Sequence, residues 1–247
     1  ADQMLCRYEN MTHSQKNLNP AALQSIDEIY LDNVTLKQLG RDPILQSVDL
    51  SLPVDQTVVI ESSKPQNAVY FLQFLAGRAP CESGQLLWNG QSIFLGDHEL
   101  DPQMILASYF ENHFIDKNIT VEKFFENTQA EDDGYDVVEM FELEKHLQSK
   151  IKDLSYDLQK TLFLVKVVLS EAQILTLEDP AVGLSEFNWL QFLDLLQYRQ
   201  RRGYLRHVYM TNNHPTALRH FAYNKIFIED GLIYFDENAG YKKASHF

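Results

Sequence analysis

The sequence predicts an α/β protein, with a core of parallel strands and helices that carries N-terminal antiparallel strands and a helical subdomain. Three observations lead to this fold class. Short apolar runs such as Thr57 to Ile60 and Ile174 to Leu177 have no polar face, as expected of buried parallel strands. The first run is followed by a polar loop and a helix, which together form the first half of a βαβ unit. The middle of the chain, Val121 to Leu169, has helical periodicity and predicts an inserted helical subdomain.

Two strands are predicted before the first buried run, and they form the N-terminal antiparallel unit. They cover Ile29 to Leu36 and Ile44 to Leu52, with a turn at Gly40 to Pro43 between them. Residues 1–27 are polar, and we interpret them as an extension with one short helix near Ala21 to Ile26.

After the first buried run we expect a loop and a helix, and then further alternation of strands and helices. The loop covers Glu61 to Asn67, and the helix runs from Ala68 to Ala76 and ends at Gly77. The remaining predicted elements are strands at Gln85 to Trp88 and His207 to Thr211, helices at Phe187 to Gln200 and up to Leu218, and a hairpin of Lys225 to Glu229 and Leu232 to Asp236 closed at Asp230-Gly231.

Composition and charge exclude several classes of protein. The 247 residues are 45% apolar, enough for a sizeable core, and a net charge of -14 argues against a nucleic-acid partner. The most apolar stretch, Leu162 to Leu169, is far below the roughly 18 residues of a membrane span. Met4 to Gln24 contains no apolar core of a signal peptide. Cys6 and Cys81 lack metal-ligand spacing, so we expect two reduced thiols, no metal and a cytoplasmic location.

Four stretches, in this order and at these spacings, resemble the ATP-binding cassette of the ABC ATPases. The helix and strand that follow the family's phosphate loop resemble Phe71 to Gly77, Ser83 to Leu86 and Asn89-Gly90. The signature segment resembles Leu154-Ser155, and Walker B with the D-loop resembles Ile174 to Pro180 and Gly183 to Ser185. The C-terminal hairpin resembles Ile226 to Ile233. The resemblance covers about residues 29 to 236 and implies a P-loop NTPase-like core.

The resemblance also implies how the chain is divided. We expect a polar N-terminal extension at 1–27, the first part of the core at 28–110, a Q-loop-like segment and helical subdomain at 111–170, the second part of the core at 171–237 and a C-terminal tail at 238–247.

At the phosphate loop the chain departs from the family pattern. The family loop, G-x-x-x-x-G-K-[ST], holds phosphates with backbone N–H groups and its Lys, and holds Mg²⁺ with its hydroxyl. The matching positions here are Ser62, Asn67, Ala68 and Val69, and Pro65 removes one N–H donor. We expect ATP affinity to fall by at least about a hundredfold. Asn67 tolerates a left-handed backbone and so allows the loop shape, although a plain strand-to-helix connection is the simpler interpretation.

The signature segment is altered as well. The family sequence L-S-G-G-Q closes over the γ-phosphate bound by the opposite subunit, and here Ser155 is followed by Tyr156 and Asp157 in place of the glycines. A ring and a carboxylate there should obstruct and repel that phosphate. We interpret Asp157 more simply as a capping or solvated residue.

Two carboxylates remain at the position of Walker B and the catalytic base. The family's Asp-Glu pair is Glu178-Asp179 here, and the shorter Asp179 would reach an attacking water poorly. The switch histidine aligns with Asn212, and His214 lies two residues later. We interpret these four residues as vestigial, with residual metal binding by the carboxylates as the alternative.

Two further family sites are also changed. The adenine-stacking aromatic falls at Gln38, and the Q-loop glutamine falls near Glu111. In the family the groove beside the Q-loop grips a helix of the membrane subunit. The resemblance therefore implies a partner contact at Glu111, Asn112, His113 and Phe114.

These sites favour a pseudo-ATPase, a structural or regulatory subunit that binds no cofactor. It would dock on a transporter-type membrane subunit or on another cassette, a homodimer included, and so lie at the inner face of the membrane. The alternative is a divergent transporter ATPase that binds ATP and Mg²⁺ and hydrolyses ATP slowly. A third hypothesis is a different ligand in the former nucleotide site, which Tyr70 and Tyr156 would enter.

Overall fold

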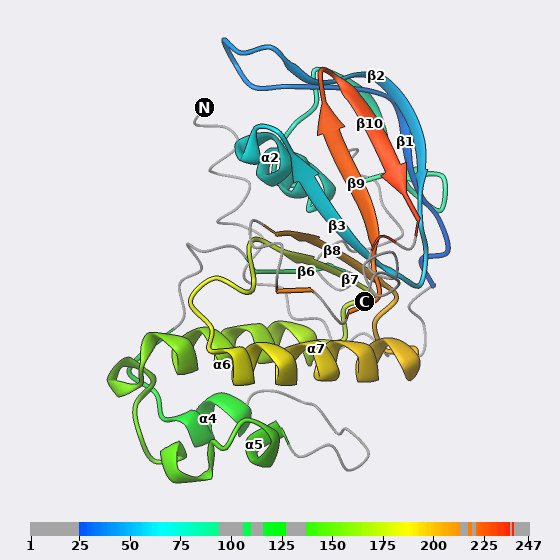
Figure 1. Cartoon of the computed structure of the whole chain (residues 1–247). Coiled ribbons are helices and arrows are strands. Elements are labelled where there is room, and N and C mark those ends of the chain that lie inside the picture. Colours follow the sequence, from blue (N-terminus) through cyan, green and yellow to red (C-terminus); the bar gives the residue numbers. More distant parts are fainter. Residues whose placement is uncertain are drawn as a thin grey trace, which may run out of the picture.

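The computed structural model (Figure 1) describes residues 25–93, 106–109, 116–126, 137–212, 217–218, 221–237 and 239. Two sheets enclose one helix, α2 (Pro65–Leu75), and a second group of helices covers the opposite face of the larger sheet. The apolar side chains accordingly form two clusters, one on each face of that sheet.

The smaller sheet is antiparallel, as predicted for the N-terminal unit. Its strand order is β2-β1-β4-β5, built from β1 (Ile29–Lys37), β2 (Pro43–Leu52), β4 (Ser83–Trp88) and β5 (Gln91–Ser92). Alternate residues of β1, among them Ile29 and Leu31, are buried against α2, while their neighbours are partly exposed.

The larger sheet has the order β10-β9-β3-β8-β7-β6, and all its neighbours are parallel except β10 and β9. Its strands are β3 (Thr57–Ser62), β6 (Leu106–Tyr109), β7 (Ile174–Leu177), β8 (His207–Thr211), β9 (Asn224–Glu229) and β10 (Leu232–Asp236). The predicted buried strands are confirmed, because β7 and β8 are buried along their whole length. Strand β6 was not predicted, since its four residues include Ala107 and Ser108 and lack a β-branched run.

The helices of the middle region lie on the other face of the larger sheet. They are α4 (Val121–Glu126), α5 (Val137–Met140), α6 (Tyr156–Val168) and α7 (Glu186–Arg201), with two short 3-10 helices at Glu144–His146 and Ile151–Asp153. In Figure 1, α6 and α7 lie beneath the sheet and α4 and α5 form a further layer below them. Within the described residues, no helix combines the length and apolar character needed to span a membrane.

Two local predictions need correction. Helix α2 begins at Pro65 rather than at Ala68, so the expected loop over residues 61–67 shrinks to two residues between strand and helix. Its predicted end is confirmed, because Gly77 follows the helix with φ of +68°. The predicted helix near Ala21 to Ile26 is wrong for residues 25 and 26, which are not helical, and the rest of it lies outside the described residues.

Residues 25–28 are bound at the amino ends of β7 and β8. The backbone of Ile26 accepts a hydrogen bond from Nε2 of His207 at 2.8 Å, and it donates one to the amide oxygen of Gln173. His207 is fully buried, and this burial lowers its pKa. The carboxylates of Asp27 and Asp55 both bind Arg206. The start of β1 is therefore tied to the larger sheet.

Candidate functional site

The parallel pairing brings the predicted site residues Ser62, Glu178 and Asn212 to one edge of the larger sheet. Strands β6, β7, β8 and β3 are neighbours and run in the same direction, so their carboxyl ends meet. Tyr109, Glu178 and Thr211 end or follow three of these strands, and Ser62 ends β3. Segments that are far apart in the sequence thus form one candidate site.

The connection between β3 and α2 contains only Ser63 and Lys64. Pro65 occupies the first turn of the helix, and the N–H of Asn67 donates to the Lys64 carbonyl at 2.8 Å. No residue from 62 to 69 has a positive φ. The side chain of Ser62 bridges this connection to β9, because its hydroxyl donates to the carbonyl of Ile228 at 2.7 Å and accepts from the Lys64 N–H.

The helix also decides where the next side chains lie. Ala68, which stands at the position of the family's lysine, is only 3% exposed and belongs to the cluster between the two sheets. Val69 is half-buried, and the Tyr70 hydroxyl donates to the Pro80 carbonyl at 3.5 Å. Residues 62–69 therefore form the end of β3, a two-residue connection and the first turn of α2.

The segment after β7 keeps an irregular backbone. The N–H of Glu178 donates to the Tyr109 carbonyl at 2.9 Å, and the N–H of Asp179 donates to the Thr211 hydroxyl at 2.9 Å. Asp179 has φ of +39°, a left-handed conformation that is uncommon outside glycine. Both acidic residues are half-buried, so two carboxylates stand at the carboxyl edge of the sheet.

The start of α6 packs against the loop that follows these carboxylates. Ser155 caps the helix by accepting a hydrogen bond from the N–H of Leu158 at 3.3 Å. Tyr156 is 58% exposed, and its ring lies on Gly183, where a Cβ atom would come within 2.4 Å of the tyrosine Cε1. Gly183 has φ of +78°, so both backbone shape and space favour glycine there.

Asp157 is engaged within the chain. One carboxylate oxygen accepts the N–H of Ser185 at 3.0 Å, and the other accepts the side-chain amide of Asn188 at 2.8 Å. Ser185 is the capping residue of α7, so Asp157 places a negative charge beside the start of that helix. Asp157 is therefore neither of the two helix caps, which are Ser155 and Ser185, but its carboxylate binds the capping residue of the neighbouring helix.

Lys160 is a residue that sequence reasoning missed. It is 2% exposed, and its ammonium donates to the carbonyls of Asp179, at 3.0 Å, and Val182. The ammonium also lies 5.4 Å from the centre of the Tyr109 ring. A signal was available, because Lys160 lies four residues before the buried Leu164 and so on the buried face of the helix.

Several predicted residues contribute no described geometry to the site. His214 and the predicted partner contact at Glu111, Asn112, His113 and Phe114 lie outside the described residues. Asn212 follows β8 and is half-buried. Within the described part of the chain, no group of three or more His, Cys, Asp or Glu side chains could hold a metal ion.

Comparison with solved structures defines the class of fold. The chain superposes on a structure described as the ATP-binding subunit of an ABC transporter with a TM-score of 0.65 and 16% identity, over 83% of this chain and 88% of the other. It superposes on a nucleotide-free ATP-binding cassette from an ABC transporter with a TM-score of 0.67 and 12% identity, over 88% and 94%. The chain therefore has the ABC ATP-binding cassette fold, of the P-loop NTPase type, as predicted.

Comparison of sequences points the same way. The chain is 24% identical over 190 residues to the cytochrome c biogenesis ATP-binding export protein CcmA of Reclinomonas americana, which covers 73% of this chain and 84% of that protein. No family model matches the sequence. The resemblance to ABC ATP-binding cassettes is thus supported by a related sequence and by the fold.

Proposed function

We propose that this chain is a cassette that neither binds nor hydrolyses ATP and acts as a structural or regulatory subunit. It would dock on a transporter-type membrane protein or on another cassette, and through that partner it would lie at the inner face of the membrane. One observation carries the proposal: helix α2 begins at Pro65, where a phosphate-binding loop would have to be.

The chemistry of phosphate binding supports this proposal. A phosphate loop needs several backbone N–H groups that point at the ligand, and it needs a lysine beyond them. Here Pro65 has no N–H, the N–H of Asn67 is bonded to Lys64, and Ala68 is buried in the core. Part of the donor set and the lysine charge that would hold the β- and γ-phosphates are therefore absent from the positions that match the family.

The signature segment supports the proposal independently. In the family this segment reaches a nucleotide held by the opposite subunit, whereas here its side chains bind residues of the same chain. Tyr156 lies on Gly183, and Asp157 binds Ser185 and Asn188. A composite site with a second cassette would have to break these contacts and accept a carboxylate beside the γ-phosphate.

The comparisons suggest the kind of partner. The similar structures are named as ATP-binding parts of ABC transporters, and the similar protein is named as an export protein of cytochrome c biogenesis. We propose by analogy that this chain also assembles with a transporter, with no nucleotide of its own.

The test is ATP binding to the purified chain by calorimetry and thermal unfolding, with and without Mg²⁺, at millimolar nucleotide. A ligand present at about 100 times its Kd stabilises a protein by about 2.7 kcal/mol, so micromolar binding would raise the Tm clearly. We expect no binding heat and no shift, while an ATP-binding cassette of the same fold measured in parallel shows both. Micromolar, Mg²⁺-dependent binding would overturn the proposal.

One observation favours the alternative of slow hydrolysis, since Glu178 and Asp179 still stand at the carboxyl edge. That hypothesis expects Mg²⁺-dependent turnover that is lost in Glu178→Gln and Asp179→Asn. It also expects Lys64, the exposed lysine between β3 and α2, to contribute to nucleotide binding. Equal, background rates of phosphate release from wild type and these variants would exclude it.

A further inference from the structure

Two strand edges face one cleft on the side of the molecule away from the candidate nucleotide site. Strand β2 is the last strand of the small sheet, and β10 is the last strand of the large one. A bridge joins them at their beginnings, where Leu45 pairs with Gly231 in parallel and the N–H of Gln46 donates to the Gly231 carbonyl at 2.9 Å. Among the described strands, β2 pairs with β1 and β10 pairs with β9.

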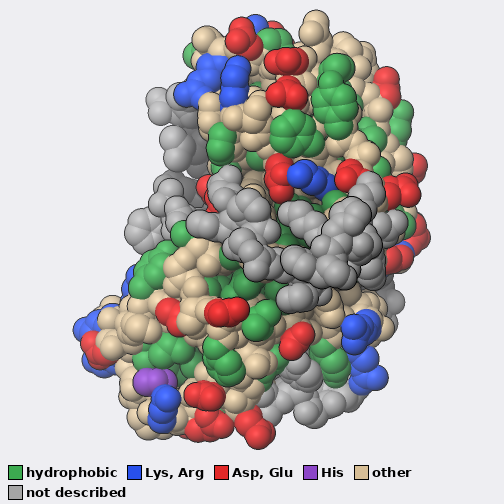
Figure 2. Space-filling view, in the orientation of Figure 1, with side chains coloured by type: hydrophobic (Ala, Val, Ile, Leu, Met, Phe, Trp, Pro, Cys, Tyr) green, Lys and Arg blue, Asp and Glu red, His purple; other side chains and the backbone are tan. Residues whose placement is uncertain are grey.

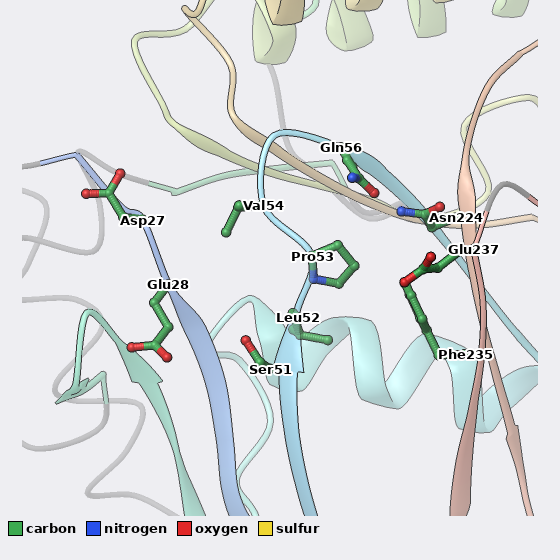
Figure 3. Close-up of a pocket in the computed structure, with 10 residues that line it drawn as sticks. All are labelled: Asp27, Glu28, Ser51, Leu52, Pro53, Val54, Gln56, Asn224, Phe235 and Glu237. Atoms are coloured by element: carbon green, nitrogen blue, oxygen red, sulfur yellow. The ribbon is translucent and has the colours of Figure 1, made fainter.

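Beyond this bridge the two strands enclose an open cleft of about 760 Å³. Figure 3 shows Ser51 and Leu52 at the end of β2, with Phe235 and Glu237 on one side of them and Glu28 on the other. A volume of this size falls in the range of clefts that hold ligands. The end of each strand thus borders the cleft, while its sheet partner, β1 or β9, still pairs with it on one edge.

The lining of the cleft combines apolar and acidic side chains. Phe235 is 39% exposed although it is a large aromatic residue, and Pro53 and Val54 are partly exposed beside it. The acidic residues are Asp27, Glu28 and Glu237, and none of the ten lining residues is Lys or Arg.

Of these three carboxylates, only Asp27 is neutralised by a described residue. Asp27 binds Arg206, and this hydrogen bond lowers the pKa of Asp27. Among the described residues, neither Glu28 nor Glu237 forms an ion pair, and both are exposed. The described side chains that line the cleft therefore carry a net negative charge, in a chain whose net charge is -14 and whose visible face in Figure 2 carries many Asp and Glu side chains.

We propose that this cleft binds an extended segment of a partner protein that carries Lys or Arg at alternate positions. Such a segment would add a strand to the edge of β10 or β2. Main-chain hydrogen bonds would then supply affinity, and alternate side chains would reach the lining. Basic side chains would approach Glu28 and Glu237, and an apolar one would lie on Phe235. The proposal is independent of nucleotide binding, because the cleft shares no residue with the candidate nucleotide site.

The probe is a fluorescein-labelled peptide, acetyl-Lys-Val-Lys-Val-Lys-Val-Lys-amide, titrated with the full chain by fluorescence anisotropy at low salt. A second peptide with Pro in place of the central Val has the same charge but cannot complete a strand ladder. We expect saturable binding of the first peptide and at least tenfold weaker binding of the second. Equal affinity for both peptides would overturn strand addition.

Two double variants locate the site. Glu28→Gln with Glu237→Gln should weaken binding of the Val peptide at least tenfold, because it removes both free charges of the cleft. Glu82→Gln with Glu186→Gln makes the same change in net charge at exposed positions outside the cleft, and it should change the affinity less than threefold. Equal losses in both pairs would mean attraction to an acidic surface and would overturn the proposal.

Hydrogen exchange provides a readout that needs no variant. The bound peptide should slow amide exchange at residues 51–54, at 232–236, or at both, and leave α4 unchanged. Protection confined to other strands would place the peptide elsewhere and overturn the assignment.

Sedimentation of the chain alone tests the competing occupant, a second copy of this chain. A dimer that dissociates in the Glu28→Gln/Glu237→Gln variant would assign the cleft to that second copy and overturn the proposal.

Discussion

The connection between β3 and α2 and the segment after β7 stand at the same edge of the large sheet, yet they differ in what has been kept. In the first, the backbone itself departs from a phosphate loop, because α2 extends to Pro65 and Ala68 is buried. In the second, the two carboxylates keep their place after the strand, and Asp179 has a left-handed backbone. The first region is therefore a two-residue connection and a helical turn, whereas the second is an irregular loop that carries two carboxylates.

This difference teaches that the two regions are under different physical constraints. Residues 65–75 form a helix whose buried face packs between two sheets, so its sequence is constrained by the core. The loop after β7 is held from outside by α6, through Tyr156, Asp157 and Lys160. Variants can therefore test the first region through core packing and the second through contacts between α6 and the loop.

The largest expected effect is that of Ala68→Lys, which restores the family's lysine. Since Ala68 is 3% exposed, the ammonium would enter a packed apolar cluster, and we expect a loss of about 3 kcal/mol or more in the free energy of unfolding. ATP binding should not return. Urea unfolding and calorimetry measure both quantities, and Gln66→Lys, at an exposed position of the same helix, should stay within about 0.5 kcal/mol of wild type. An Ala68→Lys protein that is stable and binds ATP would show that the loop can be repaired.

Next in size is Lys160→Met, which removes the two hydrogen bonds to the carbonyls of Asp179 and Val182 at nearly constant length. We expect a loss of about 2 kcal/mol, because the carbonyls lose a charged donor. Amide exchange in residues 179–184 should also become faster. Lys166→Met on the same helix removes an ammonium that lies 4.9 Å from the Phe124 ring centre and should cost less than about 1 kcal/mol. Equal stability of Lys160→Met and wild type would mean that the buried ammonium does not hold the loop.

The sequence was informative where the fold depends on patterns of apolar residues. The buried runs at Thr57 and Ile174 predicted buried parallel strands, which are β3 and β7 on either side of β8, and Asp230-Gly231 predicted the hairpin. Spacing between family-like stretches then predicted the cassette fold, which the solved structures confirm.

The details of the site were harder to predict because they depend on contacts between distant segments. The polar residues Lys64 to Asn67 resemble a loop, but Pro65 at the first helical turn starts α2 early, as proline commonly does. Helical spacing could have placed Lys160 on the buried face of α6. Its hydrogen bond to the Asp179 carbonyl, however, depends on the loop after β7 being folded onto α6, and no local pattern reveals that contact. Asp157 was interpreted as a capping or solvated residue, whereas its partners Ser185 and Asn188 lie 28 and 31 residues away.

A smaller effect is expected for Gly183→Ala, which tests the contact between α6 and the loop. The added Cβ would meet the Tyr156 ring, and φ of +78° disfavours alanine, so we expect a loss of about 1–2 kcal/mol. In a Tyr156→Ala background the steric part should disappear, which leaves a coupling of about 0.5–1 kcal/mol in a double-mutant cycle of unfolding free energies. A coupling of zero would mean that the ring moves away freely and does not hold the loop.

The smallest effect separates backbone from carboxylate at Asp179. Because its φ is +39°, glycine should be more stable than alanine there by about 1 kcal/mol. At Glu178, which has no positive φ, the order should be reversed, with alanine more stable than glycine. Thermal unfolding of the four variants measures both differences. Opposite signs at adjacent residues would mean that the left-handed backbone is built into this loop and persists without its carboxylate. If the alanine variant is the more stable one at both positions, the left-handed backbone of Asp179 is not built into the loop. The proposed difference between the β3–α2 connection and the segment after β7 would then be wrong.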